Sequence, residues 1–454
     1  MRRFPDALSF LFLCLVAASA LTWIVPAGEY ARRDDPATHR QVVVPNTYHS
    51  VQASPVRPFA ALVAIPRGFA DAIDVIAFVL LVGAGITVID KTGALGAGVD
   101  ALIRSLGRRE AWIVPIICLL FAAGGVLEGM MEEIIPLVPV MLLVSTRLGY
   151  PPVAAVAMSL LAAAVGGAFS PINPFQVGIA QKLAGLPLLS GWGVRLAFLV
   201  PALALSIWWT MRASATTRSR ALHTPPPDGA AGSAVAEHRE FTPRMALLFV
   251  LVVLAFAVYV IGVIRFDWDF DQMAALFVLL GLVAGAVGGL GVKGTSDAFV
   301  EGVRGMAFAA LVIGMARAIF VVLRDGHVID TIVYAMFIPV SHLPSVGAAV
   351  GMMVAQVLLH VPVPSTSGQA VLSMPILVPL SDLLGLSAQV TVLAYQYGAG
   401  LCEVITPTNG AMMAILVAAG VSFEEWIRFV APLFAMLLAL GAVALATAVL
   451  LHVM

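Results

Sequence analysis

Two polar stretches interrupt long apolar runs in the first half of the chain, residues 128–133 (EGMMEE) and residues 170–174 (SPINP). Ionisable residues at membrane depth usually mark a transport pathway or a binding site. Backbone that proline interrupts is tolerated there only where protein or a water-filled cavity satisfies the freed polar groups. The carboxylates of Glu128, Glu132 and Glu133 could therefore bind a cation, a proton or a basic substrate. The alternative is a solvated turn at the membrane surface.

The second half of the chain contains a counterpart of each stretch, at the same offset along the sequence. Residues 364–369 (PSTSGQ) correspond to the first stretch and residues 406–410 (TPTNG) to the second. We interpret this pattern as one structural unit used twice, with a site where the two copies meet. Transporters built from repeated units bind their substrates near the bilayer midplane, at the interface of the repeats.

The chemistry of these stretches suits a small polar substrate. Interrupted helices expose free N–H groups, which favour anions, and unwound carbonyl groups, which coordinate cations. Hydroxyl groups beside the breaks suit a carboxylate or Na⁺. The structural alternatives are proline kinks capped locally by asparagine, and an ordinary external loop at 364–369. The expected substrate-binding residues are Glu132, Ser170, Asn173, Ser365, Thr366, Ser367, Thr406, Thr408 and Asn409.

A second group of charged residues could couple transport to an ion. Arg317 lies near the middle of an apolar run, so it should pair with a carboxylate, either of the substrate or of the protein, such as Glu403. A purely structural Arg–Glu pair is the alternative. The expected coupling residues are Glu128, Glu133, Arg317 and Glu403. The coupling ion is expected to be Na⁺ or H⁺, and we expect no metal site and no other cofactor.

The composition describes a polytopic membrane protein. Hydrophobic residues make up 61% of the 454 residues and charged residues only 11%, and the mean hydropathy is +1.00. At about 20 residues per span, the chain is long enough for about ten helices. The net charge of −1 gives no indication of nucleic-acid binding, and the sequence contains no GxxxxGK[ST] motif for an ATP-driven pump.

Apolar runs separated by turn signals predict the helices. An uncleaved first helix is expected at 7–25, although a signal peptide is the alternative, and residues 28–70 read as a polar external loop. The segment at 94–107 is expected to lie at the membrane interface because it carries charged residues. The expected helices and hairpin arms are 73–90, 111–127, 134–147, 152–183 (broken), 190–211, 244–264, 272–291, 307–323, 328–340 (interfacial), 345–363, 370–384, 388–419 (broken) and 430–453.

These elements predict an all-α integral membrane protein with two inverted-topology repeats. Each repeat contains a re-entrant helical hairpin and a broken transmembrane helix. The first repeat covers residues 1–211, a cytoplasmic linker covers 212–243, and the second repeat covers 244–454. The chain is expected to cross the membrane an odd number of times between corresponding helices of the two repeats, which gives the repeats opposite orientations. This holds provided that the segment at 94–107 does not span the membrane. The distribution of Lys and Arg favours a cytoplasmic N-terminus and an external C-terminus.

Six motifs together resemble those of a known family. They are 23–30 (WIVPAGEY), 89–95 (IDKTGAL), 129–133 (GMMEE), 172–175 (INPF), 364–368 (PSTSG) and 405–409 (ITPTN). The chain resembles, over nearly its whole length, the C4-dicarboxylate anaerobic carrier-like family, also described as basic amino-acid antiporters, within the ion transporter superfamily. Met131 stands where the family pattern has Ala. Both hairpin tips depart from the Ser-Asn-Thr of the sodium-coupled relatives.

The resemblance implies a multi-pass transporter of the bacterial inner membrane that forms a homodimer and works by an elevator-type cycle. The expected function is secondary active transport, as a symporter or antiporter, of a small carboxylate-bearing metabolite. That metabolite is a basic amino acid or a C4-dicarboxylate. The expected partners are this small-molecule substrate and the lipid bilayer, with no nucleic acid. The alternatives are an ion channel or an intramembrane enzyme that uses Glu132 and Glu133 as an acid/base pair.

Overall fold

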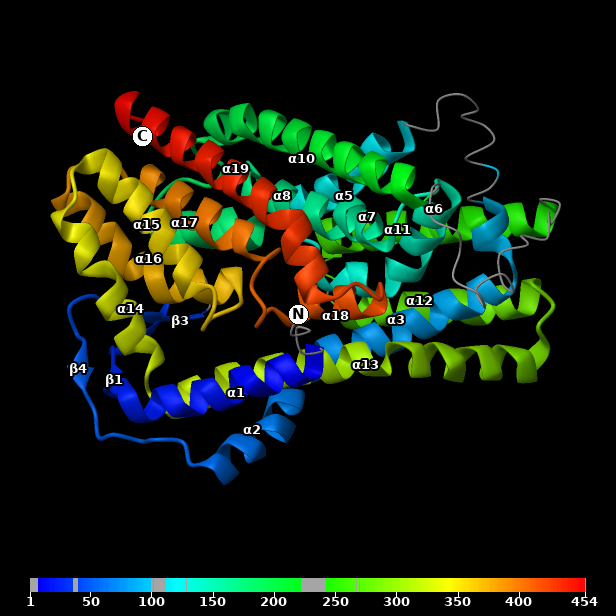
Figure 1. Cartoon of the computed structure of the whole chain (residues 1–454), viewed down its shortest axis with the longest axis horizontal. Helices are drawn as coiled ribbons and strands as arrows, with labels where there is room; N and C mark the ends of the chain where they lie inside the picture. The colour runs from blue at the N-terminus through cyan, green and yellow to red at the C-terminus, as the bar shows by residue number, and fades with distance from the viewer. Residues whose placement is uncertain are drawn as a thin grey trace.

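The structure is a computed structural model that describes residues 7–35, 40–98, 101, 112–127, 129–221, 242–266, 268 and 270–453. Its helices form two layers (Figure 1). One layer lies along the lower side of the view and is built around a single long helix, and the other lies above it. Both layers combine segments from the two halves of the sequence, so each half contributes to both.

The lower layer is built around α13 (Gly291–Asp325), a helix of 35 residues. The expected helix at 307–323 is only its second half. Small residues allow close contact between helices in this layer, since a Cβ added at Gly85 would lie 2.4 Å from the carbonyl oxygen of Phe277. The other helices of this layer are α1 (Ala7–Ile24), α2 (Pro58–Asp71), α3 (Ile73–Lys91) and α12 (Phe270–Val287), and α11 (Pro243–Phe266) packs on α12.

The upper layer contains both polar tips and both broken helices. Its first part comprises α5 (Ile113–Leu127), η2 (Glu132–Leu137), α6 (Val138–Arg147), α7 (Pro152–Val156), η3 (Ala157–Leu161), α8 (Ala162–Ala168), η4 (Pro174–Gly178), α9 (Ile179–Leu183) and α10 (Trp192–Ala221). Its second part comprises α15 (Ser345–Leu359), α16 (Thr366–Leu383), α17 (Ala388–Cys402), α18 (Gly410–Ala418) and α19 (Phe423–Leu450). The two layers meet where η2 contacts α3 and α18 contacts α13.

A small cap covers one end of the molecule. It consists of two antiparallel strand pairs, β1 (Gly28–Glu29) with β4 (His49–Ser50) and β2 (Arg32–Asp35) with β3 (Arg40–Val43). The cap also includes α14 (Ile329–Phe337) and η5 (Pro339–His342). The backbone N–H of Tyr30 donates to Asp330 (2.9 Å), and burial beside Asp330 raises the pKa of the Tyr30 hydroxyl.

The prediction that residues 28–70 form a loop was wrong. Besides the four strands, residues 58–71 form the helix α2, which packs against α13. Pro58 suits the first turn of a helix because no N–H is needed there. The tight contact of Gly68 with the backbone of Gly314 and Ala318 then holds α2 in place.

Two expected segments fall largely outside the described residues. Of the segment at 94–107, residues 94–98 and 101 are described, and they are helical. Of the linker at 212–243, residues 222–241 are not described, and α10 continues through Ala221, past the expected start of the linker. The inverted relation of the repeats and the division at 212–243 therefore stay predictions.

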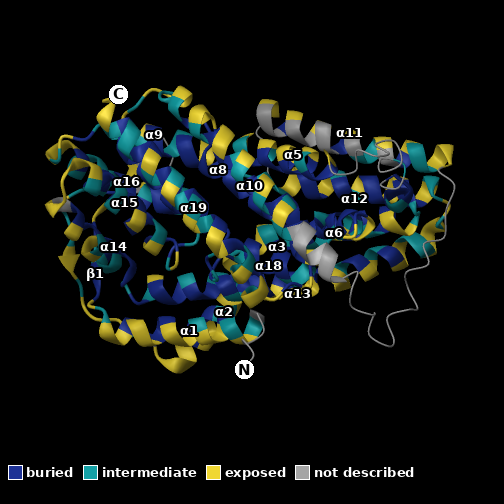
Figure 2. Cartoon of the chain, turned by 45° about the horizontal axis from the view of Figure 1, so that its top comes forward, coloured by how far each residue is buried: buried dark blue, intermediate teal, exposed yellow. Residues whose placement is uncertain are grey.

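Five helices are long and apolar enough to cross a bilayer, namely α3, α10, α12, α13 and α19, as far as the chain is described. The outer surface of α1 is exposed in Figure 2, and its exposed side chains are large and apolar, among them Leu13 (58%) and Ile24 (76%). Apolar side chains facing outward over whole helices fit a lipid environment, in which the outer surface faces hydrocarbon.

Candidate functional site

The first helix break lies where the sequence predicts it. Because Pro171 and Pro174 lack an N–H and cannot continue the helix, α8 ends at Ala168 and η4 begins at Pro174. Asn173 caps η4: its Oδ1 accepts from the backbone N–H groups of Phe175 and Gln176, both at 2.9 Å. The Ser170 hydroxyl accepts from the N–H of Asn173 (2.8 Å). Both side chains are fully buried.

The first hairpin tip contacts this break directly. The Nδ2 of Asn173 donates to the carbonyl of Gly125 (2.9 Å), and the Ser170 hydroxyl donates to the carbonyl of Val126 (2.7 Å). Gly129, at the tip, has a φ of +77°, and a Cβ there would lie 3.1 Å from the Asn173 amide. Glycine is therefore needed at this position both for the left-handed turn and for the close approach.

The second break follows the same plan. α17 ends at Cys402 and α18 begins at Gly410, and the Oδ1 of Asn409 accepts from the N–H of Met412 (2.9 Å). The Nδ2 of Asn409 donates to the carboxylate of Glu403. The Thr408 hydroxyl donates to the carbonyl of Val361 (2.6 Å), which lies beside the second hairpin tip. Thr406 is buried here.

The two breaks therefore share one arrangement. In each, an asparagine caps the helix after the break, and a hydroxyl from the break binds a carbonyl at the end of the first hairpin arm. Ser170 and Thr408 do not occupy aligned sequence positions, since Ser170 aligns with Thr406. Sequence alignment of the two repeats therefore did not show which hydroxyl of the second break binds the second hairpin. Each hydroxyl bond fixes a hairpin tip against its broken helix.

We expect Thr408→Val to loosen the second hairpin. The substitution keeps the shape of the side chain but removes the hydrogen bond to the carbonyl of Val361, which contributes about 0.5–1.5 kcal/mol. The apparent melting temperature in detergent should fall. Thr391→Val is the matched control, because Thr391 is also buried but donates weakly, at 3.5 Å, within its own helix. Equal melting temperatures for the two variants would contradict this role.

The acidic tip lies between the two layers. Glu133 is buried and accepts from the N–H of Met131 (3.0 Å). Glu132 is half-buried, and η2, which carries it, packs against α18, the helix that follows the second break. The structure therefore brings Glu132 to the second break, although the two belong to opposite halves of the chain. Glu128 lies outside the described residues.

The second hairpin tip borders a cavity of about 220 Å³. Ser365 caps α16, its hydroxyl accepting from the N–H of Gly368 (3.3 Å), and the carbonyl of Thr366 accepts from the hydroxyl of Tyr395 (2.7 Å). The cavity is lined by Arg317, Phe320, Val363, Pro364, Ser365, Ser367 and Gly368. A guanidinium group and two serines thus face one space.

Arg317 pairs with a carboxylate of the protein, as expected, but this carboxylate is not that of Glu403. The Nε of Arg317 donates to Asp71, which Arg324 also approaches at 3.8 Å. Asp71 ends α2, the helix that the sequence did not predict, and lies between the expected loop (28–70) and the expected helix (73–90). Among the described residues the two terminal nitrogens of Arg317 have no hydrogen-bond partner. They remain available to an anion.

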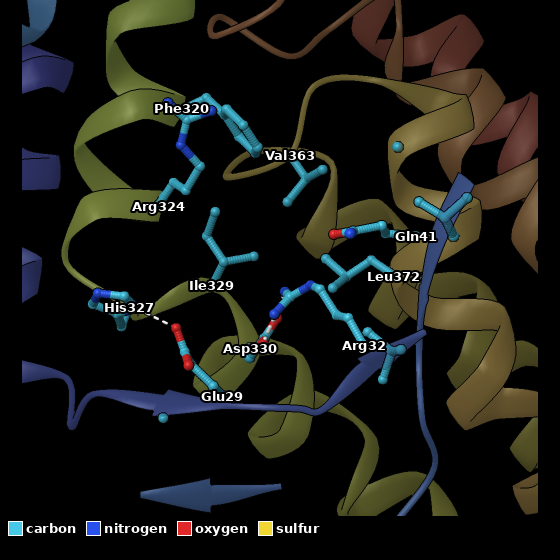
Figure 3. Close-up of a pocket in the computed structure, with 14 residues that line it drawn as sticks. Glu29, Arg32, Gln41, Phe320, Arg324, His327, Ile329, Asp330, Val363 and Leu372 are labelled. Carbon is cyan, nitrogen blue, oxygen red and sulfur yellow. Dashed lines mark hydrogen bonds and ion pairs between the residues drawn. The ribbon is translucent and has the colours of Figure 1, made fainter. Parts of the chain in front are cut away.

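A larger cavity of about 460 Å³ adjoins the first and shares Phe320, Val363 and Gly368 with it (Figure 3). Figure 3 shows the pairs His327–Glu29 and Arg32–Asp330 at its edge, the second with distances of 2.9 and 3.0 Å. Together the two cavities connect the cap to the second hairpin tip.

One buried arginine, Arg195, was not among the predicted site residues. Arg195, on α10, is fully buried, and its three donor groups bind Gln396 (2.8 Å), Gln389 (2.8 Å) and the carbonyl of Ser190 (2.7 Å). Gln396 in turn donates to the carbonyl of Ser170 (2.8 Å). An arginine inside the apolar run at 190–211 was the available signal.

A chain of buried polar residues behind the second hairpin tip was not among the predicted site residues. Four fully buried residues form a chain of hydrogen bonds, in the order His360, Gln369, Gln356 and Ser373. The chain begins beside Glu403, whose Oε1 lies 3.8 Å from the Nε2 of His360. In the part of the chain that the structure describes, no group of three His, Cys, Asp or Glu residues could hold a metal ion.

Comparison with known proteins identifies similar sequences over nearly the whole chain. Residues 4–450 match the profile of the family described as "DcuC: C4-dicarboxylate anaerobic carrier". YfcC of Escherichia coli strain K12, named as a candidate basic amino acid antiporter, is 31% identical over 481 residues, which are 97% of this chain and 95% of YfcC. An uncharacterised protein of Haemophilus influenzae strain Rd is 30% identical over 506 residues, covering 99% of this chain and 98% of its own.

Among solved structures, the YdaH transporter of Alcanivorax borkumensis aligns over 99% of both chains, with 17% identity and a TM-score of 0.45.

Proposed function

The chain belongs to the C4-dicarboxylate anaerobic carrier family, and from this we infer that it is a secondary active transporter of a small carboxylate-bearing metabolite. It is a multi-pass membrane transporter and not an enzyme. The family is described by dicarboxylate transport, and the relative YfcC is named for basic amino acids. A carboxylate group is common to both substrate classes, and a cationic side chain of the protein would bind it.

One observation carries the proposal: Arg317 and the hydroxyl-rich tip face the same cavity. The unpaired terminal nitrogens of Arg317 suit a carboxylate, which a guanidinium group binds through two parallel hydrogen bonds. Ser365 and Ser367 add neutral polar groups from the opposite layer. A substrate bound here would contact both layers at once, as a carrier requires if one layer moves against the other.

We propose an elevator-type cycle for this movement, with two inverted repeats and two re-entrant hairpins. The similar clamps at the two breaks support a repeated unit. The upper layer would move with the substrate and the lower layer would stay fixed, in a homodimer in the bacterial inner membrane. The N-terminus would be cytoplasmic and the C-terminus external. Glu132, at the acidic tip, would hold the cationic group of a basic amino acid, which favours an antiporter of basic amino acids.

We expect Arg317→Gln to weaken substrate binding. A hydrogen bond to a charged group contributes about 1.5–3 kcal/mol, so the half-saturating concentration should rise about 10- to 100-fold. Uptake kinetics in proteoliposomes give the measurement. Arg304→Gln, an exposed arginine on the same helix, is the matched control and should behave like the wild type. An unchanged half-saturating concentration for Arg317→Gln would remove this residue from the site.

Counterflow in proteoliposomes tests the function itself. Vesicles loaded with unlabelled L-arginine, L-ornithine, succinate, fumarate or malate are diluted into the labelled compound. A carrier should concentrate the label transiently for at least one of them, because exchange needs no other driving force. No counterflow for any compound, with and without sodium and at acidic and neutral pH, would reject the proposed function. Unitary currents without counterflow would indicate a channel.

A further inference from the structure

The buried pair of His360 and Glu403 has a fixed geometry that the substrate cavity does not explain. His360 is fully buried behind the second hairpin tip, and Glu403 is 7% exposed at the second break. Neither residue lines either of the two cavities described above. The Nε2 of His360 lies 3.8 Å from the Oε1 of Glu403 and, within the described residues, has no hydrogen-bond partner. A buried polar atom without a partner calls for an explanation.

The surrounding hydrogen bonds determine where the ring hydrogen of His360 lies. The Nε2 of Gln369 donates to the carbonyl of Gln356 (2.7 Å), so the Oε1 of Gln369 faces the Nδ1 of His360 (2.9 Å). That oxygen can only accept, and therefore Nδ1 carries a hydrogen. In the neutral ring Nε2 is then a bare acceptor beside a carboxyl oxygen of Glu403.

Two acceptors that face each other need a proton between them. The other oxygen of Glu403 already accepts from the Nδ2 of Asn409. A proton on Oε1 or on Nε2 would serve both groups, and a small approach of the two atoms would complete the bond. Without that proton, a buried negative charge would face a lone pair, which is unfavourable in a medium of low dielectric constant. The geometry therefore provides a site for one exchangeable proton.

The other charged groups around Glu403 strengthen this conclusion. On η2, Glu132 adds a second negative charge, and the carboxylate of Glu133 accepts a hydrogen bond from the N–H of Met131. From α13, Arg317 is turned toward Asp71. Cys402 ends α17 directly before Glu403, and α18 contributes no ionisable residue. From α19 the Trp426 indole donates to the carbonyl of Val404 (2.6 Å). Among the described residues, no Lys or Arg forms an ion pair with Glu403, so a proton can neutralise its carboxylate instead.

We propose that transport is coupled to protons and that the His360–Glu403 pair binds the coupling proton. The proposal rests on the proposed function and names its coupling ion. In each cycle the proton leaves the pair to water at one membrane face and is replaced from water at the other. Histidine suits this exchange because its charge changes between about pH 5 and 8.

Proteoliposomes without sodium provide the test, using labelled L-arginine and succinate as probes. A pH gradient should drive accumulation by the wild type. Glu403→Gln and His360→Gln should each reduce that accumulation at least about tenfold while counterflow, which needs no proton movement, stays within about threefold. Glu425→Gln and His342→Gln, both exposed, are the matched controls and should behave like the wild type.

The experiment distinguishes failure of the proposed function from failure of the proposed proton site. Absence of counterflow in the wild type defeats the proposed function and this proposal with it. Counterflow with normal pH-driven accumulation in Glu403→Gln overturns only the proton site. If the variants do not fold, the wild type decides: titration of L-arginine or succinate into weakly buffered, detergent-solubilised protein should change the proton concentration. Binding without any proton uptake or release between about pH 5 and 8 would overturn the proposal.

Discussion

Replacing Asn173 by alanine should reduce transport about 100-fold, because displacement of a binding group by about 1 Å can have an effect of this size. The substitution removes three hydrogen bonds at once: two that cap η4 and one that holds the Gly125 carbonyl of the first hairpin arm. Two N–H groups lose their partner, and the carbonyl of Gly125 keeps only the N–H of Gly129 (3.0 Å). The first hairpin tip, which carries Glu132, should then lose its fixed position against the break.

Asn173→Asp separates the two roles of this side chain. Aspartate keeps the two capping bonds but cannot donate to Gly125, so transport should remain impaired even where the fold is intact. Initial counterflow rates and gel-filtration profiles are measured together for both variants. Gln52→Ala, an exposed amide elsewhere, serves as control. Normal counterflow by Asn173→Ala would show that the first break does not position the transport site.

Replacing Arg195 by methionine should lower the free energy of unfolding by about 3–5 kcal/mol, as expected when one partner is removed from a buried charged network. The methionine chain matches the volume of the arginine stem, but it leaves the amide oxygens of Gln396 and Gln389 without donors. The carbonyl of Ser190 keeps only Gln181 as a donor. Gln396 would also hold the carbonyl of Ser170 less firmly, so the first break should loosen.

Reversible unfolding of the detergent-solubilised protein by added denaturing surfactant gives the measurement. Arg195→Lys should be destabilised as well, because an ammonium group cannot reach three acceptors in the fixed geometry of a guanidinium group. Arg428→Met is the control, since the side chain of Arg428 is 75% exposed and pairs within its own helix, an interaction of about 0.3–0.5 kcal/mol. Equal stabilities of Arg195→Met and Arg428→Met would contradict a structural role for this network.

The helix breaks could be predicted from the sequence because they depend on local chemistry. Pro171, Pro174 and Pro407 lie at the two breaks, where they lack the N–H that would continue a helix, and an asparagine before the next helix caps it. The second arm of the first hairpin begins as the 3₁₀ helix η2 because Pro136 and Pro139 lack N–H donors near its start. Such effects act over a few residues and are visible in one sequence.

The partners of the buried charges could not be predicted. Arg317 and Asp71 are 246 residues apart, and Arg195 and Gln396 are 201 apart. No periodicity relates such positions, and only the packing of α2 on α13, and of α10 and α17 on α8, brings the groups together. The prolines and arginine within α2 resembled a loop, and Asp71 at its end was not considered as a partner for Arg317.

Substrate protection of a cysteine at the second hairpin tip tests most directly whether the substrate binds between that tip and Arg317. Ser367→Cys is made in a Cys14→Ala background, because the other two cysteines, Cys118 and Cys402, are buried and should not react. The rate of maleimide labelling is measured with and without the compound that gives counterflow. At a hundredfold excess over Kd, the substrate should slow labelling at least about tenfold. Labelling of Ser345→Cys, at the exposed start of α15, should not change. An unchanged labelling rate of Ser367→Cys, at a concentration that saturates counterflow, would contradict the account.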